Sequence, residues 1–532
     1  MKLTFYGAAK AVTGSCHCVT CGGRKILIDC GLQQGRDEWD NAEFDFVPSL
    51  IDDVIVTHAH IDHTGRIPLL VKQGFRGNIY CTRLTGELMS IMLRDSAHIQ
   101  ESDARWKNQK GRRAGQPAVE PLYTLADAEA ALEHIVPCEY GREVRLDKDI
   151  TARFNDAGHL LGSATVELWL TEDGSSRKLV FTGDLGNVDQ PIIRDPQPVE
   201  GADYLITEST YGNRVHEPPV SYTASLAALF DKTLGRGGNV IIPAFAVGRT
   251  QELLYFIREM KEQNLVKSVP NFEVCVDSPL ANEATRIFSG DLEGYLDEEA
   301  LRTVRERDLF SFPNLRLITS SDESRTLNED RTPRVILSAA GMCDAGRIRH
   351  HLKHNLWRPE CSIVFVGYQG EGTLGRALLD GAQAVRLFGE TIEVNADIVF
   401  FQGLSSHADQ THLLAFAEHF APAPRHTFVV HGQGEVAEQF AYLLKERKIP
   451  AHAPEPGEVY DLIGNRLLEA GTPRVKTAPA AKAIPSASPA WRRLEQTAKE
   501  LMQVVERNRG GANKDLAKFA DQLKALMNKW DR

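Results

Sequence analysis

The chain has 532 residues, of which 42% are hydrophobic, and it carries a formal net charge of −11 at pH 7. This length is several times that of a usual domain, so we expect two or three domains with cores of their own. No apolar run approaches the length of a membrane span and the first residues do not resemble a secretion signal, so we expect a cytoplasmic protein. An acidic chain repels phosphates as a whole, so a nucleic acid would need a local positive site to bind.

The first part of the chain is rich in short runs that are typical of β-strands. They are KLTFYG, CHCVTC, KILIDCG, DDVIVTH, TARFNDAGH, TVELWLT, KLVFTGDLG and DYLITEST. After Tyr211 the pattern changes to helix, strand, helix, which indicates a parallel sheet covered by helices. Strand-like runs return near residues 391–434, so the sequence predicts one domain interrupted by another.

The end of the chain differs in composition from the rest. Residues 471–490 are rich in Ala, Pro and Ser and are typical of a linker. In residues 491–532 apolar side chains recur at helical spacing on either side of Gly510 and Gly511, which predicts two amphipathic helices. This tail could dock on its own chain or on another protein, and the sequence leaves both open.

Ligand-type side chains are concentrated in VTHAHIDHTG, residues 56–65. The four are His58, His60, Asp62 and His63, and they follow the apolar run DDVIVT, so we expect them on the loop that leaves a buried strand. Imidazole and carboxylate ligands together suit zinc or a similar divalent ion. The HxHxDH spacing therefore predicts a metal site.

Three further ligand-type residues follow later strand-like runs. His159 lies in NDAGHLLGSA, Asp184 in VFTGDLG and His431 in FVVHGQG. A single histidine of this kind is more often a core or surface residue. Three such residues, each after or near the end of an apolar run, predict that a second metal site can be completed.

The motifs HAHIDH, AGHLLGSA, FTGDLG and VVHG, in this order, resemble the metallo-β-lactamase superfamily. The resemblance implies an αββα sandwich with two zinc ions at the edge of its sheets. It implies one zinc held by His58, His60 and His159, the other held by Asp62, His63 and His431, and Asp184 bridging both. Asp29, in ILIDCG, would order the histidine loop from behind the ligands.

Five other stretches resemble the β-CASP branch, in which a second α/β domain with a parallel sheet is inserted into the sandwich. They are LITESTYGNR, PAFAVGRTQELL, SAAGMCDAGR, GYQGEGTLGR and SSHAD. The resemblance implies a sandwich formed by residues 1–209 and 391–470, an inserted domain at 210–390, and then the linker 471–490 and the helical tail 491–532. Glu208, His407 and His431 match the branch's motifs A, B and C. DNA-directed members generally carry valine at the last of these, so His431 favours RNA.

Hydrolysis of a phosphodiester needs a nucleophile at neutral pH and positive charge near the phosphoryl oxygens, and a two-metal site can supply both. We expect a hydroxide activated by the two zinc ions, with Asp62 counted among the catalytic residues. His407 is the candidate general acid for the leaving ribose oxygen, and Glu208 would orient it and keep it protonated. The resemblance implies products with 5′-phosphate and 3′-hydroxyl ends.

Contacts to the RNA backbone are predicted less directly. The stretch SAAGMCDAGR passes from a strand through a glycine turn into a helix, whose N-terminus could receive a phosphate, or it is a plain turn. The candidate substrate-binding residues are Ser338, Gly341, Met342, Arg376 and Ser406. RWKNQKGRR, residues 105–113, is expected to be a loop that grips single-stranded RNA or is merely solvated.

Two other patterns have a plainer interpretation than a binding site. GEGTLG, residues 370–375, fits a dinucleotide-binding pattern, but it lies within the stretch that resembles the inserted domain. Cys16, Cys18 and Cys21 could bind a metal, yet no second cysteine pair with the spacing of a zinc site follows, so small core residues are the better interpretation.

The sequence thus favours a zinc-dependent endoribonuclease with single-stranded RNA as its partner and a homodimer as one possible assembly. A 5′-to-3′ exoribonuclease of the same branch is an alternative. A lactamase-like thioester or lactam hydrolase would have no need of the inserted domain. A non-catalytic RNA-binding scaffold would be expected to have lost metal ligands, and all of them are present here.

Overall fold

The computed structural model describes residues 1–35, 40–112, 115–216, 222–401, 405–473, 497–498, 501–502 and 504–530. The chain divides into two compact units, Met1–Thr472 and Pro473–Arg532, and all the sheets of the described residues belong to the first. Within these ranges, no helix combines the length and the apolar character needed to cross a membrane.

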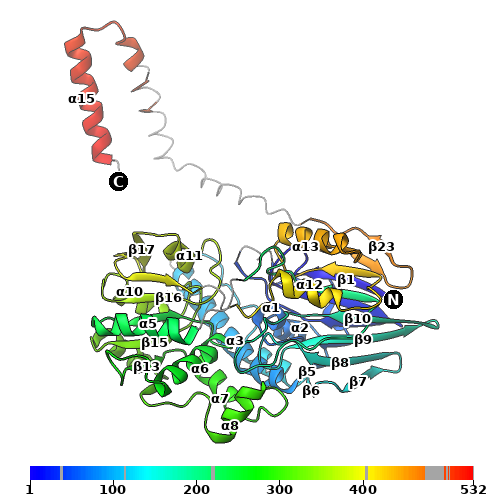
Figure 1. Cartoon of the computed structure of the whole chain (residues 1–532). Coiled ribbons are helices and arrows are strands. Elements are labelled where there is room, and N and C mark those ends of the chain that lie inside the picture. Colours follow the sequence, from blue (N-terminus) through cyan, green and yellow to red (C-terminus); the bar gives the residue numbers. More distant parts are fainter. Residues whose placement is uncertain are drawn as a thin grey trace. The chain divides into compact units, whose positions relative to one another are not determined.

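Two β-sheets form the part of the first unit that contains its N-terminus (Figure 1). The strand order of the first is β23 (Arg466–Glu469), β22 (Val459–Asp461), β1 (Lys2–Gly7), β2 (Cys16–Cys21), β3 (Arg24–Ile28), β4 (Asp53–Ile55), β5 (Asn78–Thr82) and β6 (Ile135–Cys138). The order of the second is β21 (Ala451–His452), β20 (His426–Val429), β11 (Tyr204–Thr207), β10 (Ser175–Phe181), β9 (Ala164–Glu172), β8 (Ile150–Asp156) and β7 (Glu143–Asp147). One buried cluster joins Phe5 and Val19 of the first sheet to Val166 and Phe428 of the second, so the sheets face each other.

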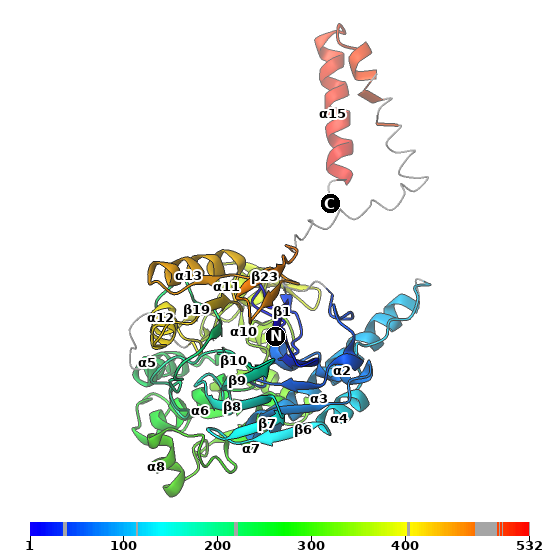
Figure 2. The same cartoon turned by 90° about the vertical axis from the view of Figure 1, so that its right-hand side faces the viewer.

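Helices cover the outer face of each sheet. On the first sheet lie α2 (Ile67–Lys72), α3 (Arg83–Arg112) and α4 (Leu125–Leu132), and on the second lie α12 (Gln410–Glu418) and α13 (Gly434–Glu446). Leu70 and Leu88 share a cluster with Val54, while Phe440 packs with Leu205. Figure 2 shows the two helical layers on opposite sides of the strands. The αββα sandwich expected from the sequence is therefore confirmed.

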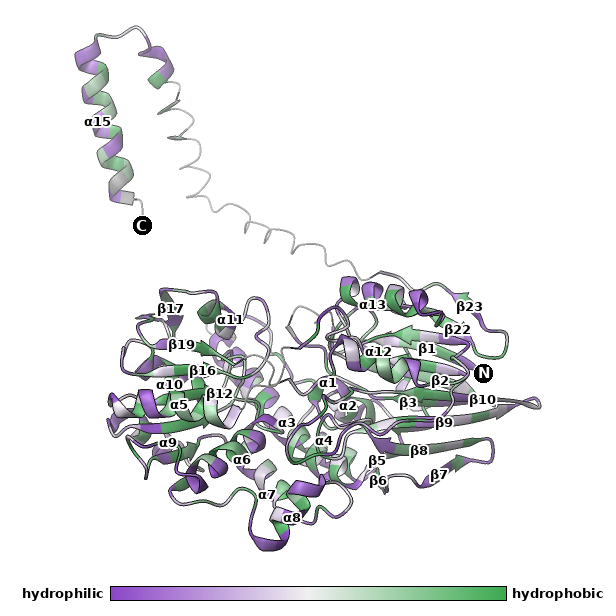
Figure 3. Cartoon of the chain, viewed as in Figure 1, coloured by the Kyte–Doolittle hydropathy of each residue, from purple (hydrophilic) through white to green (hydrophobic). Residues whose placement is uncertain are grey.

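A third sheet is inserted into the sandwich and contains only parallel pairs. Its order is β14 (Leu315–Leu317), β13 (Glu273–Val276), β15 (Arg334–Ser338), β12 (Val240–Pro243), β16 (Ser362–Phe365) and β19 (Asp397–Phe400). Strands β12, β15 and β16 are buried along their whole length and are mostly hydrophobic in Figure 3. Continuous apolar strands of this kind are typical of a parallel sheet with both faces covered.

Helices lie on both faces of the inserted sheet. Val240 and Ile242 share a cluster with Phe230 of α5 (Tyr222–Gly235), whereas Ile241 faces Leu352 of α10 (Ile348–Asn355). The other elements of this domain are α6 (Arg249–Glu262), α7 (Pro279–Phe288), α8 (Glu298–Glu306), α9 (Ser321–Glu329), α11 (Leu374–Leu379) and the hairpin β17 (Ala384–Leu387) with β18 (Glu390–Glu393). Helix α7 packs on α3 in the same buried cluster, so α3 joins the inserted domain to the sandwich.

Two details differ from the sequence-based expectation. β19 pairs with β16, so the inserted domain continues past residue 390 and the chain returns to the sandwich after Phe400. An apolar run such as IVFF indicates a strand but does not say which sheet it joins.

Residues 105–112 belong to α3 and are not a loop. Arg, Lys and Gln are good helix formers and make up most of this segment, so the helix continues through it as far as Arg112.

The second unit contains α15 (Asn513–Trp530), which carries hydrophobic and hydrophilic residues along its length in Figure 3. Residues 504–507 are also helical. The amphipathic helix predicted for the second half of the tail is confirmed. The predicted linker, from residue 474 onward, and the start of the first tail helix lie outside the described residues.

Candidate metal centre

The histidine loop begins where β4 ends, as the sequence predicts. His58 lies in the loop, His60 caps α1 (Ile61–Thr64), and the first turn of α1 presents Asp62 and His63. Three backbone hydrogen bonds tie this turn to neighbouring loops, from Ser15, Cys30 and Leu32 to the carbonyl oxygens of residues 61–63. Gly31 makes the approach possible, because a Cβ there would lie 1.6 Å from the carbonyl oxygen of Asp62.

The other candidate ligands come from strand ends of the second sheet. β8 and β10 are both antiparallel to β9, and β10, β11 and β20 are parallel to one another. Their carboxyl ends therefore lie at one edge of the sheet. His159, Asp184, Glu208 and His431 follow these four strands and meet the histidine loop there.

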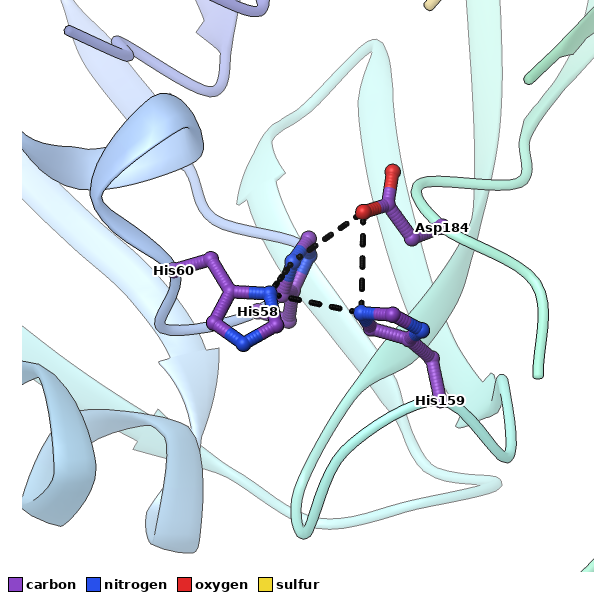
Figure 4. Close-up of side chains that lie close together, drawn as sticks. All are labelled: His58, His60, His159 and Asp184. Atoms are coloured by element: carbon purple, nitrogen blue, oxygen red, sulfur yellow. Dashed lines mark hydrogen bonds and ion pairs between the residues drawn. The ribbon is translucent and has the colours of Figure 1, made fainter. Parts of the chain in front are cut away.

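The first donor set comprises His58, His60, His159 and Asp184 (Figure 4). His60 Nδ1 lies 3.0 Å from His58 Nε2 and 3.3 Å from His159 Nε2. Asp184 Oδ2 lies 3.5 Å from His58 Nε2 and 3.6 Å from His159 Nε2. Four donor atoms from three loops thus converge on one point.

The second donor set comprises Asp62, His63 and His431, and it faces the other oxygen of Asp184. His63 Nε2 lies 3.1 Å from His431 Nε2, and His431 Nε2 lies 3.5 Å from Asp62 Oδ2. Asp184 Oδ1 lies 3.3 Å from His63 Nε2 and 3.5 Å from His431 Nε2. The two oxygens of Asp184 therefore address two different donor sets.

These distances fit a metal ion in each set. Zinc binds nitrogen and oxygen ligands at about 2.0–2.2 Å, so neighbouring donors around a tetrahedral ion are separated by about 3.3–3.6 Å. Asp184 Oδ1 is buried and makes no hydrogen bond of acceptable geometry within the described residues, although His63 Nε2 and His431 Nε2 lie 3.3 Å and 3.5 Å away. A buried carboxylate oxygen without a donor is costly unless a cation lies beside it. The chemistry of the donors and this oxygen both fit zinc.

The pKa values of the candidate histidine ligands differ between the two donor sets. Burial lowers the pKa of His58 and His159 well below the usual value, so both imidazoles are neutral, as metal ligands must be. Burial would raise the pKa of Asp184, but the surrounding histidines outweigh it and hold that pKa well below its usual range. Asp184 and Asp29 outweigh burial at His63 and raise its pKa, so a cation arriving at His63 Nε2 would displace a proton.

Four candidate ligands have their second ring nitrogen engaged by a partner. His63 Nδ1 lies 2.7 Å from Asp29 Oδ2, His58 Nδ1 lies 3.2 Å from the Thr57 hydroxyl, and His431 Nδ1 lies 3.1 Å from the Thr210 hydroxyl. His159 Nδ1 lies 3.2 Å from the carbonyl oxygen of Ser406. Such contacts orient imidazoles toward a metal and are usual around metal sites. Asp29 also accepts hydrogen bonds from the backbone and the hydroxyl of Thr57.

Beside the donor sets, Glu208 and His407 form a pair. Glu208 is fully buried, and its Oε1 accepts a hydrogen bond from the Leu185 amide at 2.7 Å and lies 3.2 Å from His407 Nδ1. His407 Nδ1 is also 4.0 Å from Asp184 Oδ2. Burial would lower the pKa of His407, but the neighbouring Glu208 carboxylate outweighs burial and raises the pKa to about 9. Metal cations next to Asp184 would oppose this rise, since they repel a protonated imidazole.

The segment that carries His407 is fixed to the sandwich. Gly186 and His407 form an isolated β-bridge, and the Asn187 amide donates to the Ser406 carbonyl oxygen at 3.0 Å. His216 Nε2 lies 3.0 Å from the His407 carbonyl oxygen. The sequence predicts that Ser406 contacts substrate. In the structure, the carbonyl oxygen of Ser406 contacts the Nδ1 atom of His159.

The other expected phosphate contacts lie on the inserted domain. The Ser338 hydroxyl is buried and donates to the Asp277 carbonyl oxygen at 2.9 Å, so it is engaged within the domain. Gly341 lies against the ring of Phe245, and Met342 is half-buried. Arg376 is exposed on α11 and pairs with Asp380 at 2.7 Å. The stretch from Ser338 does lead into a helix, α10, which starts at Ile348.

Sequence reasoning missed Thr57, Thr210 and His216. Thr57 directly precedes the histidine motif, so its position was a usable signal, because residues next to ligands often support them. Thr210 and His216 reach the site only through the folded chain, and nothing in their sequence surroundings marks them.

Cys16, Cys18 and Cys21 are buried in β2, which confirms that they are core residues.

The sandwich, the inserted parallel sheet and the His and Asp clusters together define a metallo-β-lactamase-type hydrolase with a β-CASP domain. Models of known families match it in three segments: the metallo-beta-lactamase superfamily over residues 10–244, the Beta-Casp domain over 250–378, and the Zn-dependent metallo-hydrolase RNA specificity domain over 391–454.

The chain belongs to the β-CASP ribonuclease family of metallo-β-lactamase proteins. It is 37% identical over 436 residues to Ribonuclease TTHA0252 of Thermus thermophilus, covering 82% of this chain and 94% of the relative. It is 32% identical over 455 residues to Transcription termination factor FttA of Methanocaldococcus jannaschii, covering 83% and 68%. It is 30% identical over 461 residues to the RNase J-like protein of the same organism, covering 86% and 99%.

Proposed function

We propose that the protein is a ribonuclease that uses two zinc ions to hydrolyse RNA at internal phosphodiester bonds, leaving 5′-phosphate and 3′-hydroxyl ends. The observation that carries the proposal is one carboxylate, Asp184, shared by two donor sets, with the Glu208 and His407 pair beside it. The names of two relatives and the matched RNA specificity domain support RNA as the substrate.

Zinc ions in the two donor sets would supply an activated water and positive charge for the phosphoryl oxygens. The first ion would be held by His58, His60 and His159, the second by Asp62, His63 and His431, and Asp184 would contact both. Asp29 would fix the His63 ring through Nδ1 and keep Nε2 pointing at its ion.

His407 would deliver the proton that the leaving ribose oxygen needs. Its Nδ1 faces Glu208, so Nε2 is the nitrogen that can carry a proton toward substrate. The His407 side chain is 20% exposed, whereas Glu208 is 0% exposed, so the imidazole reaches the open side while the carboxylate anchors it. A positioned imidazole of this kind contributes about 100-fold to 10,000-fold in rate.

The experiment is incubation of the full-length protein with a 5′-labelled and an internally labelled RNA, with and without a chelator. Internal fragments that carry 5′-phosphates and disappear with the chelator would support the proposal. Release of 5′ mononucleotides would assign the protein as a 5′-exonuclease instead. Lack of cleavage by the zinc-loaded protein would contradict both and favour a binding role.

The number of ions can be measured separately. Zinc content by mass spectrometry should be two per chain, and His58→Ala and His431→Ala should each lower it, because they remove a donor from different sets. A content of one zinc that only one of these substitutions lowers would contradict a two-ion centre.

A further inference from the structure

The end of α3 carries a cluster of cations that the metal centre does not use. Arg105, Lys107, Lys110 and Arg112 are exposed, and Trp106 between them keeps 56% of its surface exposed. We call these five residues the α3 tip. The light-blue end of α3 projects from the rest of the first unit in Figure 2. In a chain of net charge −11, four cations within eight residues form a local positive site.

The α3 tip has one packed face and one open face. Ala104 and Gly111 are buried and Asn108 is half-buried, and at 3.6 residues per turn these three share one side of the helix. The Asn108 side chain holds the returning chain through two hydrogen bonds, accepting from the Val119 amide at 2.7 Å and donating to its carbonyl oxygen at 2.9 Å. The tip is therefore a supported helix with a defined orientation.

On the open face the indole is flanked by cations. Helical geometry places Trp106 at the middle of this face, Arg105 and Arg112 along one side of it, and Lys107 and Lys110 along the other. The Lys110 ammonium lies 4.1 Å from the centre of the Trp106 ring. A flat ring between two rows of positive charge matches a nucleic-acid strand, whose bases stack on aromatic rings while its phosphates meet cations.

The cations of the tip differ from those earlier in the same helix. Arg83 pairs with Glu87 at 2.9 Å, and Arg94 pairs with Glu129 at 2.7 Å. Within the described residues, no carboxylate lies within ion-pair distance of the four tip cations, although Asp103 and Glu120 lie nearby in sequence. Among the described residues, then, no carboxylate neutralises the charges of the tip.

The tip also lies at a defined distance from the metal centre. At its start, α3 contacts the loop of His159, because the Thr85 hydroxyl donates to the Gly162 carbonyl oxygen at 2.7 Å. A rise of 1.5 Å per residue places Arg105 about 33 Å along the helix from Arg83. A short RNA bound at the metal centre would not reach the tip, whereas a long one would.

We propose that the α3 tip is a second contact for single-stranded RNA, which holds the substrate at a distance from the bond that is cut. This inference rests on the proposed ribonuclease function. It gives the tip a role in affinity for long RNA and none in the chemical step.

The test compares two triple variants of the full-length protein. The first, R105Q/K107Q/R112Q, removes three tip cations and leaves Lys110 beside the indole. The matched control, R142Q/R145Q/K148Q, removes two arginines and a lysine from exposed positions in and beside strand β7. Cleavage is measured on single-stranded RNAs of about 4 and about 40 nucleotides, because a strand rises at least about 3.4 Å per nucleotide and only the longer RNA can span the distance to the tip.

We expect the tip variant to raise KM for the long RNA at least about 10-fold and to leave kcat unchanged. The slope of log KM against log salt should fall by about 2, since each lost phosphate contact removes about 0.7. Trp106→Ala should raise KM for the long RNA about 5-fold or more through lost stacking. The short RNA and the control variant should behave like the unaltered protein.

Three other results would contradict either the role of the α3 tip or the proposed function. If the unaltered protein cuts RNA but the tip variant has the same KM and salt slope on the long RNA, the inference is wrong. An equal change in the control variant, or on the short RNA, would also overturn it, because bulk charge or a folding defect would then explain the effect. If the unaltered protein cuts neither RNA, it is the proposed function that fails.

Discussion

Replacing His407 with alanine tests the assignment of the proton donor. His407 belongs to neither of the donor sets assigned to the zinc ions, and its Nδ1 faces Glu208 at 3.2 Å. We therefore expect His407→Ala to keep its zinc and to lose about 100-fold to 10,000-fold in kcat, which corresponds to about 3–5 kcal/mol of transition-state stabilisation. His419→Ala, at an exposed position next to α12, is the matched control and should keep full activity.

The assay is single-turnover cleavage of RNA, with the zinc content of each variant measured in parallel. A second substrate, in which sulfur replaces the leaving 3′ oxygen, sharpens the result. A thiolate leaves without protonation, so His407→Ala should cut this substrate almost as fast as the unaltered protein does. Loss of zinc from the variant, or an equal rate loss on both substrates, would refute the role of His407 as proton donor.

Further predictions concern its neighbours and the metal. Glu208→Gln removes the carboxylate that raises the pKa of His407, so the fall in kcat at high pH should begin at a pH lower by about 1 unit; an unchanged pH profile would contradict this. Asp29→Asn should weaken zinc binding about 10-fold to 100-fold, measured by competition with a chelator, because His63 loses its charged partner. Gly31→Ala should lower the free energy of unfolding in denaturant by about 2–3 kcal/mol and reduce zinc content, whereas Gly22→Ala, with open space around it, should leave zinc content unchanged. Chelation should lower the melting temperature, and zinc should restore it, because only the folded chain assembles the donor sets.

The fold was predictable from the sequence where local pattern determines it. Short β-rich runs indicated the strands of the first part of the chain, and the alternation of helices and apolar strands after Tyr211 indicated a helix-covered parallel sheet. The arrangement of the first strands as a sandwich was implied by the resemblance to the metallo-β-lactamase superfamily. The placement of β19 was not predictable, because an apolar strand can join either sheet and only tertiary pairing decides. The run of charges at residues 105–113 predicts a loop, and this prediction is wrong for residues 105–112, whose side chains favour the helix that the structure shows.

The grouping of the candidate metal ligands was predictable in part from the sequence. The HxHxDH motif fixes four candidate ligands within one loop, and strand ends supply the others. Contacts made through backbone or hydroxyl groups left no trace in the sequence. The carbonyl oxygen of Ser406 on His159 is one example, since every residue has a carbonyl. Thr210 on His431 is another, because a lone threonine carries no sign of its partner.

The attachment of the His407 segment has a mechanical consequence. This segment follows the last strand of the inserted sheet, yet it is bonded to the loops of His159 and Gly186 in the sandwich, as well as to the side chain of His216. The proposed proton donor and the candidate metal ligands are therefore both held by the sandwich. If the inserted domain tilted to admit or release a strand of RNA, the spacing between His407 and the ligands would be preserved.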